Sequence, residues 1–422
     1  MPLRILILNE FIMSKNYSTI EKNIAKFLSG SPKVKKLIKN TYQRLSFLLH
    51  KKNEKLILKS GYKVRKVGDS GNTFFGYYDK SPISPCGKYI AFIETESDTS
   101  KKPSHANSIV RVVVKDLAEM TTVFQDEISA FNWQQGNRLH WIDSEQIVYN
   151  IYDGNTDDYH CIKVNIYTKQ SMKYELPLAD SYNNDFFINL DYKKLANLRP
   201  DYGYFSHLQP CDEKTKIYKI DFISGVRKLL FSLDQLDSEV SLEKQKINHV
   251  MISPDGSKFI FMHRFYDKND SRVDNLYSYD LAEDKLKKLN TGKMVSHLCW
   301  ISNNELFGYL SNEKNEFGFF TVDVFSNSLT KIKELDEFGD GHPSYMNGKV
   351  LIDSYPNKSR MQLLYLFDLK TKKVEDVAEF FHGFKFAGET RCDLHPRYIS
   401  DKNYAVDSVY QNTRGLYLVS HD

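Results

Sequence analysis

Strand-like apolar runs alternate with polar turn sequences along the chain from about residue 67 onward. The clearest example is 248–289, where NHVMISPDGSKFIFMHRFY is followed by NLYSYDLAEDKLKKL. Turn signals such as SPDG between apolar runs predict hairpins, so this stretch is expected to form a small antiparallel meander. One meander leaves an apolar face uncovered, and several copies therefore have to stack on one another.

The unit recurs seven times. Its copies begin near residues 77, 138, 180, 248, 296, 342 and 395. Repeats of roughly 40 to 50 residues with about four strands each are typical of β-propeller blades. We therefore predict an all-β fold, a seven-bladed β-propeller over residues 67–422. The aromatic content of 14% agrees with this prediction, because aromatic side chains favour strands.

Residues 1–66 form a basic leader, with 16 Lys/Arg against three acidic residues. Apolar residues recur there at helical spacing, which predicts a short basic α-helical N-terminal extension. The longer helical face comprises Val34, Leu37, Ile38, Tyr42, Leu45, Leu48 and Leu49. An earlier one comprises Ile20, Ile24, Phe27 and Leu28.

Two partners suit such a leader. A basic amphipathic helix can lie on an anionic membrane surface, here through residues 15–66. The alternative is that it packs against the remaining chain, whose charge balance is acidic. Nucleic acid is not expected, since no basic patch with interleaved aromatic residues continues beyond the leader.

The five cysteines show no CxxC spacing, which favours a reducing, cytoplasmic location over a disulfide framework. No apolar run approaches the roughly 18 residues of a spanning helix. We predict a cytoplasmic protein, with the inner face of the membrane as a peripheral location.

Histidines recur at one position of the repeat. His249, His297, His342 and His395 each lie about four residues before the first turn of units four to seven, and His140 occupies a comparable place in unit two. The first strand of a blade lines the central channel, so these imidazoles are expected to converge there. The alternative for any one of them is a structural role at the start of its strand.

Converging imidazoles with a carboxylate could hold Mn²⁺, Zn²⁺ or a related ion. The candidate carboxylates are Asp340, Glu389 and Asp393. The predicted metal ligands are His249, His342, His395, His297 and Glu389.

The SPDG turn and the ending YxxDLxxxxxxxL resemble the TolB-like or WD40-like propeller repeat. The stretches GDGHPSY (339–345) and ETRCDLHPRY (389–398) are similar to the metal-bearing stretches of the oligogalacturonate lyases. This resemblance implies metal ligation by His342 and His395, with His249 as the third histidine. That family also uses a Gln, whereas Glu389 stands near His395 here.

The chain also resembles propeller proteins found among bacterial surface-polysaccharide, or capsule, biosynthesis genes. The residues concerned include FFGYYDKSP (74–82), FNWQQGNRLHW (131–141) and GETRCDLHP (388–396). This resemblance implies a carbohydrate ligand. Within 131–141 a mixture of aromatic, amide and basic side chains suits sugar binding. The predicted substrate-binding residues are Trp133, Gln134, Gln135, Arg138, Arg199 and Tyr77.

Uronate lyases need a positive charge on the carboxylate, a base and an acid. Arg264, Arg391 and Arg199 could supply the charge, whereas His140, His263 and Tyr78 could exchange protons. The predicted catalytic residues are His140, Tyr78, Arg264, His263 and Arg391. Packing of Tyr77 and Tyr78 in the channel wall, and pairing of Arg264 with Asp267 or Asp274, are the structural alternatives.

The function predicted from these residues is β-elimination on a uronate-containing glycan, by a carbon-oxygen lyase. One alternative is a non-catalytic glycan-binding or scaffold protein of polysaccharide assembly. Another is a glycan transferase or hydrolase. No GxSxG, Walker or dinucleotide motif is present to favour other chemistry.

Overall fold

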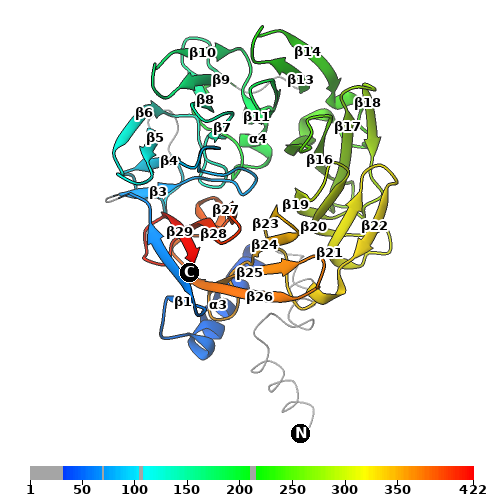
Figure 1. The fold of residues 1–422 in the computed structure, drawn as a ribbon. Coiled ribbons are helices and arrows are strands. Elements are labelled where there is room, and N and C mark those ends of the chain that lie inside the picture. Colours follow the sequence, from blue (N-terminus) through cyan, green and yellow to red (C-terminus); the bar gives the residue numbers. More distant parts are fainter. Residues whose placement is uncertain (1–31, 69–70, 104–107, 210–214) are drawn as a thin grey trace.

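The computed structural model describes residues 32–68, 71–103, 108–209 and 215–422, with side chains from residue 41 onward. The predicted helical face from Ile20 to Leu28 lies outside these residues. The described chain forms seven antiparallel sheets around a central axis (Figure 1). It is therefore a seven-bladed β-propeller with an α-helical extension, as predicted.

The first four blades each contain four strands. Blade one contains β3 (Asn72–Phe74), β4 (Tyr89–Thr95), β5 (Val110–Asp116) and β6 (Thr122–Ile128). Blade two contains β7 (His140–Trp141), β8 (Gln146–Asp153), β9 (Asp158–Asn165) and β10 (Ser171–Tyr174). Blade three contains β11 (Leu178–Tyr182), β12 (Phe186–Asn189), β13 (Lys216–Asp221) and β14 (Arg227–Ser232). Blade four contains β15 (Lys246–Ile252), β16 (Lys258–Tyr266), β17 (Arg272–Asp280) and β18 (Lys285–Lys288).

Of the last three blades, blades six and seven include strands from the predicted leader. Blade five contains β19 (Val295–Trp300), β20 (Glu305–Ser311), β21 (Phe317–Asp323) and β22 (Ser328–Lys331). Blade six contains β23 (Pro343–Met346), β24 (Lys349–Asp353), β25 (Met361–Asp368), β26 (Val374–Phe381) and β1 (Leu56–Leu58). Blade seven contains β27 (Arg397–Ser400), β28 (Asn403–Ser408), β29 (Gly415–His421) and β2 (Tyr62–Lys66).

The propeller therefore begins before residue 67, the start predicted from the sequence. The β2 strand is antiparallel to β29, with Tyr62 opposite His421, and it closes the ring. The β1 strand covers the outer edge of blade six. Both strands are short and rich in basic residues, so the composition of the leader hides their role as sheet edges.

Apolar side chains fill the spaces between neighbouring blades. One buried cluster joins Phe92 of blade one, Ile147 of blade two and Leu416 of blade seven. Adjacent sheets pack face to face through such clusters, as the uncovered meander faces require. This packing holds the innermost strands at fixed positions around the axis.

Two α-helices lie among the described residues, α3 (Pro32–His50) and α4 (Tyr192–Leu198). Asp191 caps α4 by accepting a hydrogen bond from the backbone N–H of Lys194. Short 3-10 helices span Leu233–Gln235, Leu242–Lys244, Lys333–Leu335 and Gly388–Thr390. In the described part of the chain, neither α-helix has the length and apolar character needed to cross a membrane.

Residues 75–82, here called the plug segment, follow β3 and fill the channel. Tyr77 contacts His249 of blade four, and the Tyr78 hydroxyl bonds Leu298 of blade five. Asp79 pairs with Arg138 of blade two, and Lys80 with Asp180 of blade three. Arg397 of blade seven donates to the carbonyl of Tyr77. One segment thus contacts five blades.

Gly76 allows this segment to enter the channel. Its φ is +112°, and a Cβ there would lie 2.5 Å from the backbone of Gln135. Only glycine fits such a close backbone approach at positive φ.

Candidate functional site

Four of the five predicted histidines meet inside the channel and form the histidine cluster: His249, His297, His342 and His395. The ring centroids of His249 and His297 are 5.5 Å apart, those of His297 and His342 3.9 Å, and those of His342 and His395 4.4 Å. All four side chains are buried. The repeat register therefore predicts this convergence correctly.

His140 does not join the cluster's chain of ring contacts. Its Nδ1 donates to the carbonyl of Arg138, which leaves Nε2 as an acceptor for the Ser181 hydroxyl at 2.7 Å. This contact links the innermost strands of blades two and three. The prediction that His140 converges with the other histidines is wrong because its ring is directed between blades.

The cluster is held by irregular backbone. The ladder between β15 and β16 shifts register between Asn248 and Met251, and His249 has a φ of +55°. The β19–β20 ladder shifts between Val295 and Leu298, on either side of His297. His395 has a φ of +45°. Non-glycine residues at positive φ are uncommon and cluster at functional sites.

Asp353, at the end of β24, orients two members of the cluster. Its Oδ1 accepts hydrogen bonds from the backbone N–H and Nδ1 of His342, at 2.7 and 2.9 Å. Its Oδ2 accepts the backbone N–H of His395 at 3.0 Å. The Nδ1 of His395 donates to the carbonyl of Gly76 at 2.7 Å. Both rings therefore carry their neutral-state proton on Nδ1.

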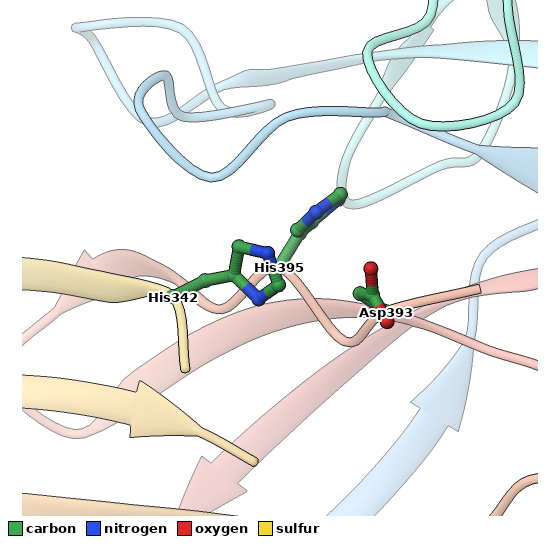
Figure 2. A group of neighbouring side chains, drawn as sticks. All are labelled: His342, Asp393 and His395. Carbon is green, nitrogen blue, oxygen red and sulfur yellow. The ribbon is translucent and has the colours of Figure 1, made fainter. Parts of the chain in front are cut away.

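The Nε2 atoms of His342 and His395 are buried and have no hydrogen-bond partner among the described residues. One ligand atom from each of His342, His395 and Asp393 lies within 4.8 Å of the others. Figure 2 shows the three side chains, which come from the loops leading into β23 and β27. Two unpaired imidazole nitrogens beside a carboxylate are donors that suit Mn²⁺ or Zn²⁺.

Nδ1 contacts to a carboxylate and a carbonyl are the usual support for ligating histidines, because they direct Nε2 to the ion. His342 and His395 both have such support. The residues present therefore fit a divalent ion with three protein ligands.

The carboxylate of this group is Asp393. The predicted ligand Glu389 instead pairs with Lys102, and that pairing directs its side chain to another partner. Asp393 accepts hydrogen bonds from Arg391 at 2.7 to 2.8 Å. Burial opposes its ionisation, but the Arg391 guanidinium holds the pKa of Asp393 well below its usual range.

Protonation differs within the cluster. Burial opposes charge on His342, yet the Asp353 carboxylate raises the pKa of His342 above its ordinary value. Burial lowers the pKa of His249, His297 and His395 well below the ordinary value. His342 is thus the member that holds a proton most readily when no metal is bound.

His297 belongs to a second small network. The Ser296 hydroxyl donates to Asp340 at 2.5 Å and lies 3.0 Å from Nδ1 of His297. Because that hydroxyl proton goes to Asp340, Nδ1 of His297 is the donor to Ser296. Burial raises the pKa of Asp340 to about 6.

Five basic side chains that interact electrostatically with the cluster or with one another are here called the cationic rim. They are Arg199, Lys246, Arg264, Arg272 and Arg391. Arg264 lowers the pKa of both His249 and His297 electrostatically, after burial. Arg264 and Arg272 share Asp274, at 3.1 and 2.7 Å. Arg264, predicted as a catalytic residue, is thus paired with Asp274, which was one form of its structural alternative.

Arg199 and Arg391, two rim residues that were predicted from the sequence, each contact other side chains. Arg199 pairs with Asp201 at 2.8 Å and lies over the Tyr202 ring. Arg391 lies over the ring of Tyr355, 5.2 Å from its centroid. Both guanidinium groups are about a quarter exposed, at 28% and 26%.

Tyrosines line the other sides of the cluster. The Tyr78 hydroxyl donates to the carbonyl of Leu298 and accepts its N–H, at 2.9 and 3.1 Å. These two hydrogen bonds use both the proton and an acceptor site of the Tyr78 hydroxyl, the group predicted to exchange protons. The Tyr77 hydroxyl forms a short hydrogen bond with Nδ1 of His249. Burial raises the pKa of Tyr77 well above 10.

The remaining predicted residues lie in the propeller wall. His263 bonds Gln245 at 2.8 Å, and burial lowers its pKa to about 4. Trp133 donates to the carbonyl of Lys101, and Arg138 forms a twofold pair with Asp79. Gln134 donates to the carbonyl of Arg391, which links it to the rim.

Residues 131–141 are almost wholly buried, so these side chains meet neighbouring blades. In particular, Gln135 is buried and its backbone N–H bonds Asn132. The same mixture of side chains that suits sugar binding here serves as hydrogen-bonded packing.

A cavity of about 300 Å³ lies beside Tyr78, and none of the four cluster histidines lines it. It is lined by Tyr78, Lys80, Asp180, Trp300, Ser344 and Tyr398, among others. Tyr78 also contacts the rings of His297, His342 and His395, so it separates the cavity from the cluster.

The fold and this channel define the class of protein: a seven-bladed propeller of the kind predicted. The structure is similar to oligogalacturonate lyase from Vibrio parahaemolyticus, with a TM-score of 0.59, 11% identity, and coverage of 86% of this chain and 96% of the other. It is similar to the β-propeller domain of the Trilobed protease from Pyrococcus furiosus, with a TM-score of 0.50, 13% identity, and coverage of 82% and 94%.

A TolB structure from Agrobacterium tumefaciens matches with a TM-score of 0.36, 15% identity, and coverage of 72% and 93%. No protein-family model and no curated protein matches the sequence. At these identities, the similarities to the oligogalacturonate lyase and to the Trilobed protease propeller show the fold alone.

Proposed function

We propose that the chain is a lyase that cleaves a uronate-containing glycan by β-elimination at the histidine cluster, in bacterial surface-polysaccharide metabolism. The observation that supports this most is the pair of unpaired Nε2 atoms of His342 and His395 beside Asp393. The cationic rim adds the positive potential that an anionic sugar requires.

The residues present suit the three tasks of β-elimination. A divalent ion held by His342, His395 and Asp393 would polarise the uronate carboxylate when bound. Arg391 and Arg199, which are partly exposed, would pair with the same carboxylate from the rim. These contacts acidify the proton on the carbon beside the carboxylate.

His249 and Tyr77 form the acid–base pair of this proposal. Neutral His249 takes the proton from that carbon, the bond to the leaving sugar oxygen breaks, and a carbon–carbon double bond forms. The Tyr77 hydroxyl protonates the leaving oxygen and regains its proton from His249 through their hydrogen bond. The raised pKa of Tyr77 keeps it protonated and able to donate.

The test combines metal analysis with product formation. Purified full-length protein is analysed for Mn and Zn, then mixed with uronate oligosaccharides while ultraviolet absorbance of the unsaturated product is followed. We expect His342→Ala with His395→Ala to lose the metal and to lower the rate at least about 100-fold. His160→Gln, which changes a buried histidine outside the cluster, is the matched control.

Absence of both bound metal and unsaturated product would refute the lyase proposal. Oligosaccharide binding by calorimetry without any product would instead support the glycan-binding alternative. The deep burial of all four imidazoles, at 1 to 4% exposed, is the observation that favours a scaffold protein, the other form of the non-catalytic alternative.

A further inference from the structure

The α3 helix presents an apolar face to solvent. Leu45, Leu48 and Leu49 are 57, 64 and 78% exposed. Their spacing of three and four residues places them on one side of the helix. They belong to the longer apolar face identified in the sequence, the face that would have been buried if the leader packed in the usual amphipathic manner.

The opposite side of α3 is attached to the propeller. The Phe47 ring packs against Phe381 and Phe384, with centroids 5.8 and 5.6 Å apart. The Arg44 guanidinium lies 5.2 Å from the Phe384 centroid. Lys52, just after the helix, pairs with Glu379. These contacts fix the rotation of α3 and hold its leucines outward.

The charged side chains of α3 and of the two residues after it are of one sign. Residues 32–52 contain seven Lys/Arg and no Asp or Glu. A symmetric contact between two copies of the helix would bring like charges together, which disfavours a second chain as the occupant. An apolar helical face flanked by Lys and Arg matches the interface of a bilayer with anionic lipid headgroups.

We propose that α3 docks this protein on the surface of an anionic lipid bilayer, with Leu45, Leu48 and Leu49 inserted among the lipids and the basic residues near the headgroups. The helix lies in the interface, and the propeller stays in water. This proposal is independent of the proposed lyase activity.

Docking through α3 would set the orientation of the channel. Phe384, which contacts the helix, lies in the loop between β26 and β27. The same loop carries Arg391, Asp393 and His395. The loop of residues 382–396 therefore connects the helix contact with Arg391, Asp393 and His395, and a docked molecule holds this loop near the membrane.

Vesicle co-sedimentation of the full-length protein tests the proposal. Vesicles of phosphatidylcholine with phosphatidylglycerol are compared with vesicles of phosphatidylcholine alone, at low and high salt. We expect binding to the anionic vesicles, at least tenfold weaker binding to the neutral ones, and a decrease with salt. The variant Leu45→Ser, Leu48→Ser, Leu49→Ser is expected to bind anionic vesicles at least tenfold more weakly.

The matched control changes three exposed apolar residues of the β13–β14 hairpin, as Ile223→Ser, Val226→Ser, Leu229→Ser. It is expected to bind like the unmodified chain. Failure of the unmodified chain to bind would overturn the proposal. Equal binding by the leucine variant, or a dimer in lipid-free solution that only this variant dissociates, would overturn it too.

Discussion

Asp353 is the residue on which the geometry of the candidate metal group depends most. One carboxylate holds the Nδ1 of His342 and the backbone N–H groups of both His342 and His395. Asp353→Asn replaces one acceptor oxygen by an NH₂ donor, which faces an N–H. We expect Mn²⁺ or Zn²⁺ affinity to fall about 10- to 100-fold, as for other residues that orient ligands.

Titration calorimetry of the purified protein measures this affinity. Asp221→Asn, which changes an exposed turn on the outer side of blade three, is the control. Unchanged affinity in Asp353→Asn would show that His342 and His395 do not bind the ion through the arrangement described here.

Lys246 gives the rim a dependence on pH. Burial, together with Arg264 and Arg199, lowers the pKa of Lys246 to about 8. An unfolded lysine titrates near 10.4, so the unfolded state binds more protons between about pH 8 and 10.4, and stability rises with pH in that window. Below about pH 8, Lys246 is charged in the folded state as well as in the unfolded state. The folded state then bears the full free-energy cost of burying that charge.

We therefore expect Lys246→Met to raise the free energy of unfolding by about 1 to 3 kcal/mol at pH 7, with the gain disappearing above about pH 10.4. Urea denaturation at both pH values measures the difference. A variant that is less stable at pH 7 would mean that the ammonium group is stabilised by its surroundings.

Among the elements, the plug segment depends on a close backbone contact. Gly76 lies against the backbone of Gln135, and its carbonyl accepts hydrogen bonds from His395 and Arg397. We expect Gly76→Ala to lower the free energy of unfolding by about 2 to 4 kcal/mol, because both strain at positive φ and a backbone clash result.

Gly87→Ala is the matched control for this change. Gly87 also has a positive φ, +74°, but a Cβ there would meet nothing within 4 Å. It is expected to cost about 1 kcal/mol, from strain alone. Equal costs for the two variants would show that contact with Gln135 does not determine the position of the plug segment.

The sequence predicts some of these elements better than others. The sequence predicts which residues form the apolar face of α3, but it does not predict that this face points to solvent. That orientation depends on the contacts of Phe47 with Phe381 and Phe384. The sequence also does not predict the register shifts at His249 and His297, because the same residues could form a regular antiparallel ladder.

At the scale of the whole molecule, stability depends on strands that precede the repeats. Removal of residues 1–55 would delete α3 and leave β1 and β2 in place. Removal of residues 1–66 would delete the outer edge of blade six and the strand that closes blade seven. We expect the first truncation to keep the melting temperature within a few degrees.

The second truncation is expected to lower the melting temperature by more than about 10 °C or to cause aggregation. The reason is that β29 would lose β2 and become an unpaired edge strand along its whole length. Differential scanning calorimetry compares the two. Equal melting temperatures would show that ring closure by β2 contributes little to stability.

The number of blades and the convergence of four histidines follow from the repeat register, because equivalent positions in a ring share one radius. Asp353 and the plug segment could not be found in this way. Asp353 ends a second strand, whereas the repeated histidines precede or lie in first strands, and Tyr77 and Tyr78 lie between the first two strands of blade one. Asp393 was among the candidate carboxylates, but only the structure separates it from Glu389.

The pairing of β2 with β29 also constrains the order of assembly during synthesis. The β2 strand leaves the ribosome before any complete blade exists, whereas β29 follows the last of them. A growing chain can form its first six blades before synthesis ends, but β2 stays unpaired until β29 of the seventh blade has been made. Such long-range pairing is slow and leaves a strand edge exposed. Protection of β2 until synthesis is complete is therefore a requirement for this protein in the cell.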